Sequence, residues 1–67
     1  MAQNLELSVK YFQLAADNGI LAAINKMGEL YLFGEVIPAN LTKAISCFTA
    51  ASEQGYGKAS YWLGRLH

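Results

Sequence analysis

The sequence has few of the residues that usually hold a small domain together. Among its 67 residues the single cysteine, Cys47, excludes an internal disulfide, because such a bond needs two cysteines. The single histidine, His67, excludes a metal site built from the usual set of cysteine and histidine ligands. A domain of ~60 residues buries only about 60% of its unfolded surface, so its core is small. Without disulfides or a metal, association is the remaining way to complete such a core.

Charge is also scarce, at 15% of the residues against about 25% in an average domain. The five basic and five acidic residues balance. The basic residues are spread singly, whereas nucleic acids and anionic membranes require clustered positive charge. No run approaches the roughly 20 apolar residues of a membrane span, and the first residues do not resemble a secretory signal. We therefore expect a soluble chain with no nucleic-acid, membrane or metal partner, and an intracellular location is favoured.

What the chain does have is apolar surface and an internal repeat. Hydrophobic residues make up 54% of the sequence. When the chain is shifted by 36 residues, eight of the 31 aligned pairs are identical, whereas roughly two are expected by chance. The identical pairs are Asn4/Asn40, Leu5/Leu41, Phe12/Phe48, Ala15/Ala51, Gly19/Gly55, Ala23/Ala59, Gly28/Gly64 and Leu30/Leu66. This period is typical of helical solenoids, so we divide the single domain 1–67 into a repeat at 4–39 and a truncated repeat at 40–67.

Each repeat is predicted to contain two helices. Asn4 and Asn40 are suited to be N-caps, because the asparagine oxygen accepts a hydrogen bond from a free N–H of the first turn. Gly19 and Gly55 are expected to end the first helices, and Gly34 a second one, because glycine adopts the left-handed conformation at little cost. The predicted fold is all-α, with about four helices.

Two glycines lie at the same position inside the second helices. Glycine in a helix interior costs about 1 kcal/mol relative to alanine. Its occurrence at both Gly28 and Gly64 predicts two close helix crossings with no room for a Cβ.

These recurring residues resemble the Sel1-like repeat, a relative of the tetratricopeptide helical arrays. The first repeat carries the family pattern in residues 8–19, in Met27-Gly28-Glu29-Leu30-Tyr31 and from Gly34 to Asn40. The second carries it as Ala44, Phe48, Ala51, Gly55, Ala59, Leu63, Gly64 and Leu66. The resemblance implies an α–α superhelix, or solenoid, of antiparallel helix pairs, with the first helices on the concave side. It also implies a role as a scaffold or adaptor for other proteins.

Four residues depart from the family pattern. Val36 replaces a loop glycine, and Asn25 replaces an aromatic residue of the second helix. Leu14 and Trp62 stand at positions that are usually polar, so they add apolar surface.

Nothing in the sequence indicates an enzyme. The serines and Cys47 are possible nucleophiles, but the only possible histidine base, His67, is the last residue. Cys47 is interpreted as a small, buried or half-buried thiol, with a redox role or an intermolecular disulfide as the alternative. We interpret Glu29 and Glu35 as solvated charges. We therefore predict no catalytic, cofactor-binding or metal-binding residue.

Two functional hypotheses remain open. In the first, the chain is an interaction module that binds a protein partner through exposed residues of its helices. The candidates are Lys10, Tyr11, Leu14, Cys47, Ala50, Tyr61 and Trp62. In the second, the chain is a structural fragment or subunit, and the same apolar surface serves to stack on further repeats or on another copy.

Overall fold

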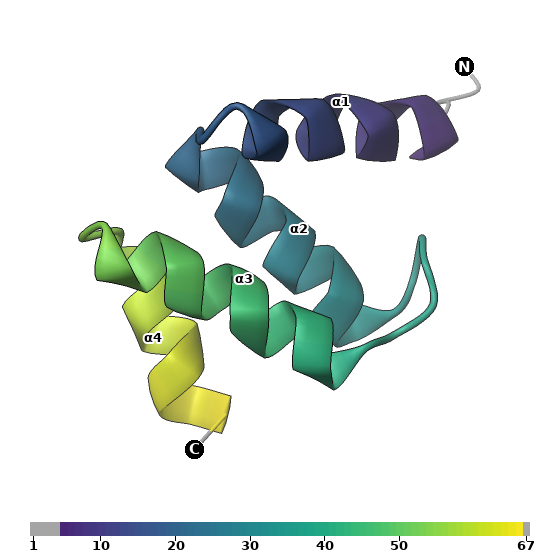
Figure 1. The fold of residues 1–67 in the computed structure, drawn as a ribbon. Coiled ribbons are helices and arrows are strands. Elements are labelled where there is room, and N and C mark those ends of the chain that lie inside the picture. Colours follow the sequence, from purple (N-terminus) through teal and green to yellow (C-terminus); the bar gives the residue numbers. More distant parts are fainter. Residues whose placement is uncertain (1–4, 67) are drawn as a thin grey trace.

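The structure, a computed structural model, describes residues 5–66, with side chains from residue 7 onward. Four helices follow one another along this range, and no strand occurs between residues 5 and 66. They are α1 (Leu5–Asp17), α2 (Leu21–Phe33), α3 (Leu41–Glu53) and α4 (Gly57–Leu66). Each helix turns back and packs on the one before it, so that α2 and α3 lie between α1 and α4 (Figure 1). The predicted all-helical repeat fold is confirmed.

The predicted glycine helix ends are also confirmed. Gly19, Gly34 and Gly55 have φ values of 82°, 67° and 91°. Since side chains make this left-handed region costly, glycine allows the chain to reverse direction within a few residues. The turns after α1 and α3 are consequently short, and both repeats fold into tight helix pairs.

The N-cap of α3 is present as predicted. The Asn40 side-chain oxygen accepts a hydrogen bond from the backbone N–H of Lys43 at 3.1 Å. The predicted cap at Asn4 lies outside the described residues, and so does His67. Within residues 5–66, no helix has both the length and the apolar character needed to cross a membrane.

Phe48 on α3 joins the two repeats. Its side chain is fully buried, and its ring stacks on Trp62 of α4 with 5.9 Å between ring centroids. On the opposite side, an ideal Cβ built on Gly28 of α2 would lie only 2.6 Å from the ring. The close crossing predicted at Gly28 is therefore confirmed, and the core around Phe48 is completed by Ala44, Ala51 and Ala59.

The close crossing predicted at Gly64 is wrong. Gly64 is exposed, and a Cβ built on it would meet nothing within 4 Å among the described residues. The reason is positional: α3 follows α2 and covers Gly28, whereas α4 is the last helix that the structure describes.

The interpretation of Glu29 as a solvated charge is also wrong, while Glu35 is exposed as expected. The Glu29 carboxylate accepts hydrogen bonds from Trp62 Nε1 at 3.1 Å and from Asn25 Nδ2 at 3.3 Å. Lys26 Nζ lies 3.8 Å from its other oxygen. Asn25 and Trp62, two departures from the family pattern, thus share one carboxylate, which links α2 to α4.

Candidate partner-binding groove

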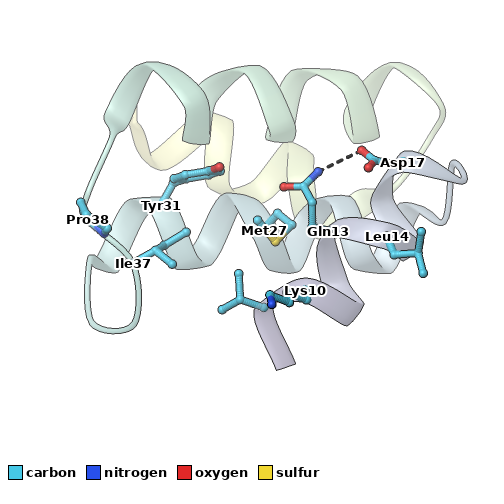
Figure 2. A pocket seen from close by; sticks show the side chains of 9 residues that line it. Lys10, Gln13, Leu14, Asp17, Met27, Tyr31, Ile37 and Pro38 are labelled. Atoms are coloured by element: carbon cyan, nitrogen blue, oxygen red, sulfur yellow. Dashed lines mark hydrogen bonds between the residues drawn. The ribbon is translucent and has the colours of Figure 1, made fainter. Parts of the chain in front are cut away.

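A shallow, open groove of about 510 Å³ lies beside α2. Figure 2 shows Met27 near its centre, Ile37 and Pro38 at one end, and Leu14 and Asp17 at the other. We call this hollow the α1–α2 groove. Its lining residues come from three segments: Val9, Lys10, Gln13, Leu14 and Asp17 of α1, Met27 and Tyr31 of α2, and Ile37 and Pro38 of the following loop.

One wall of the groove is formed by side chains that lie on the same face of α1. Residues three or four apart share one face of a helix, and Lys10, Gln13, Leu14 and Asp17 follow this spacing. Gln13 Nε2 donates a hydrogen bond to Asp17 Oδ1 at 2.9 Å. Leu14 remains 60% exposed, so this wall presents a large apolar side chain that the described chain covers only in part.

Helix α3 contributes a charge beside the groove floor. Lys43 Nζ lies 5.5 Å from the centroid of the Tyr31 ring, within the range of a cation–π contact. Cys47, one turn further along α3, is half-buried, as the sequence indicated. Burial raises the pKa of the Cys47 thiol, and the Lys43 charge acts in the opposite direction. Because the raised pKa favours the neutral thiol, Cys47 adds no negative charge beside Lys43.

Of the candidate residues on α1 and α3, the structure brings only Lys10 and Leu14 together in the groove wall. Tyr11 lies beside them on α1 and is 64% exposed, but it does not line the groove. Cys47 and Ala50 are half-buried on α3.

The two candidates on α4 belong to a separate aromatic cluster. Trp62 is half-buried and makes edge-to-face contacts with Phe33 and Tyr61, each with 5.6 Å between centroids. Tyr61 is 59% exposed, and the Arg65 guanidinium lies over its ring, 5.7 Å from the ring centroid. Since α4 packs on α3 and α1 on α2, this cluster and the α1–α2 groove are different surfaces (Figure 1).

Sequence reasoning missed the groove floor. Met27 and Tyr31 belong to the family motif of the second helix and are not among the predicted partner-binding residues, and Met27 is only 2% exposed. Both nevertheless line the groove, where Tyr31 is half-buried and Met27 contributes almost no accessible surface. The available indication in the sequence was the spacing of four residues between Met27 and Tyr31, which places both on one face of their helix, as it does Lys10 and Leu14 on theirs.

Comparison with known proteins agrees with the fold. A model of the Sel1 repeat matches residues 1–20 and 21–56. Protein sel-1 homolog 2 of Rattus norvegicus is 39% identical over 56 residues, which are 84% of this chain and 8% of that protein, so the chain spans only a small part of this relative. No solved structure matches the chain. The repeat boundaries at 39 and 40 stay a prediction.

The Sel1 repeat is a non-catalytic helical repeat, and proteins use it to bind other proteins. The family match covers most of the sequence, and the structure has the helices and glycine turns expected from it. The chain belongs to the Sel1 repeat family.

Proposed function

We propose that this chain is a protein-interaction module that binds a segment of a partner protein in the α1–α2 groove. The observation that carries the proposal is the exposed Leu14 in the wall of a groove whose floor is Met27 and Tyr31. Ligand sites are typically concave, mostly apolar and about 300–1,000 Å³ in volume, with a few polar groups that orient the ligand. Lys10, Gln13 and Asp17 are such polar groups here, and the role of the family in protein interactions supports the same conclusion.

The shape of the groove favours an elongated ligand. It follows α1 from Val9 to Asp17, a rise of about 12 Å along the helix axis. A peptide segment of a few residues fits this length, with its apolar side chains against Leu14 at one end and Ile37 at the other. Tyrosine is enriched among the residues that dominate binding energy, so Tyr31 is a suitable anchor in the floor.

This proposal is tested with peptides selected on the chain itself. A phage-displayed library of random peptides is enriched on the immobilised 67-residue chain, and the enriched peptides are synthesised and titrated. Leu14→Asp is expected to weaken their binding by about tenfold or more, because it places a charge where apolar side chains meet.

Leu41→Asp is the matched control. Leu41 is 55% exposed and does not line the groove, so this variant should bind as the wild-type chain does. Circular dichroism verifies that both variants keep their helices. If Leu14→Asp binds every enriched peptide with unchanged affinity, the groove is not the site.

Stacking on a further repeat is the second candidate function, and the open space above Gly64 favours it. Gly28, the same repeat position, receives Phe48, whereas Gly64 has no neighbour within the described chain. Sedimentation equilibrium should then show an apparent mass that rises with concentration for the wild-type chain but not for Gly64→Leu, which fills the space. A wild-type chain that stays monomeric at every concentration contradicts self-stacking.

A further inference from the structure

We propose that the groove selects an acidic segment, one that combines apolar side chains with carboxylates that meet Lys10 in the groove wall and Lys43 beside Tyr31. This inference rests on the proposed function, because it names the chemistry of the partner that occupies the same groove. It is carried by the position of two lysines on different helices.

The two lysines approach the groove from α1 and α3. Lys10 is itself part of the lining, and so is Tyr31. Lys43 Nζ lies 5.5 Å from the Tyr31 ring centroid, which places a second cation beside another residue of the lining. A ligand in the groove therefore meets Lys10 along α1, and it meets Lys43 where it reaches Tyr31.

Neither lysine is neutralised within the described part of the chain. The ion pair that forms there is Lys26–Glu29, and no carboxylate of the described side chains lies within 4.0 Å of Lys10 or Lys43. Lys26 and Glu29 line a different hollow, together with Glu35, so their charges do not face this groove. Lys10 and Lys43 are both exposed, so a ligand carboxylate can approach each of them.

The one carboxylate of the groove lies at its other end. Asp17 is seven residues after Lys10, about 10 Å along the helix, and accepts a hydrogen bond from Gln13. In Figure 2 it lies beside Leu14, on the side away from Ile37 and Pro38. The groove is therefore basic near Tyr31 and apolar to acidic near Leu14, so it also favours one orientation of the ligand. Complementary charge of this kind raises specificity and association rate more than it raises affinity.

The experiment uses the peptides enriched on the wild-type chain. We expect aspartate and glutamate to be over-represented in them relative to the input library. Exposed charge pairs contribute up to about 1 kcal/mol each, so the double variant Lys10→Glu/Lys43→Glu should weaken binding by about tenfold or more, and added salt should weaken the wild-type interaction. Lys58→Glu is the control, because Lys58 is exposed on α4 and does not line the groove.

A second arm assigns the effect to the ligand carboxylate. Replacing the acidic residues of a peptide by their amides should weaken its binding to the wild-type chain but not to the double variant, since the lysines are then absent. Peptides that depend on Leu14 yet contain no excess of acidic residues, or bind the double variant with unchanged affinity, overturn this inference and leave the proposed function standing. Peptides that do not depend on Leu14 overturn both.

Discussion

Phe48→Ala is expected to lower the free energy of unfolding by about 3–5 kcal/mol, the cost of removing a fully buried aromatic side chain. The Phe48 ring fills the space between Gly28 of α2 and Trp62 of α4, so its removal leaves a cavity where both repeats meet. A small single core rarely supplies more than about 3–5 kcal/mol in total. The variant should therefore be largely unfolded, although only one side chain changes.

Urea unfolding followed by circular dichroism measures this effect, with Phe33→Ala as the matched control. Phe33 is 56% exposed and contacts Trp62 only at its edge. Its replacement should cost about 1 kcal/mol, the contribution of one aromatic contact and some surface burial. If Phe48→Ala destabilises the chain no more than Phe33→Ala, then Phe48 is not the joint between the repeats.

Gly28→Ala and Gly64→Ala should change stability in opposite directions. The added Cβ at position 28 would lie 2.6 Å from the Phe48 ring, which is buried and has no room to move, so overpacking should cost about 1–3 kcal/mol. At position 64 the Cβ meets nothing among the described residues, and alanine is the better helix former, so about 0.5–1 kcal/mol should be gained.

The same unfolding experiment compares the two variants at a concentration where the chain is monomeric. Each variant is the control for the other, because the substitution is the same, although Gly28 lies in the interior of α2 and Gly64 in the last turn of α4. Stabilisation by Gly28→Ala would contradict the close packing of α2 on α3. Destabilisation of the monomer by Gly64→Ala would show that α4 packs on a part of the chain outside residues 5–66.

Local features of the fold could be predicted because they depend on neighbouring residues. The N-cap at Asn40 and the left-handed Gly34 follow from the chemistry of single positions. The repeat also indicated that Gly28 lies at a close crossing. The prediction of a close crossing at Gly64 was wrong for another reason. The position of a residue in a repeat indicates which face of the helix it lies on, but not whether another helix covers that face.

Contacts across the repeats were harder to predict. Glu29 was misinterpreted because its hydrogen-bond donor, Trp62, is 33 residues away on another helix. Helical spacing orients each side chain about its own axis but does not fix the rotation of α4 relative to α2. The same limit applies to the groove. Lys10 and Leu14 could be proposed as surface residues of α1, whereas the contribution of Met27 and Tyr31 can be predicted only when the position of α1 on α2 is known.

Mapping the amide chemical shifts of the isotope-labelled chain on addition of an enriched peptide most directly tests whether partners bind in the α1–α2 groove. We predict that the largest changes occur along residues 9–17, at Met27 and Tyr31, and in the loop at Ile37. The aromatic cluster of α4 should change little. Largest changes at Tyr61 and Trp62, with α1 unaffected, would contradict the proposal and place the partner site on α4.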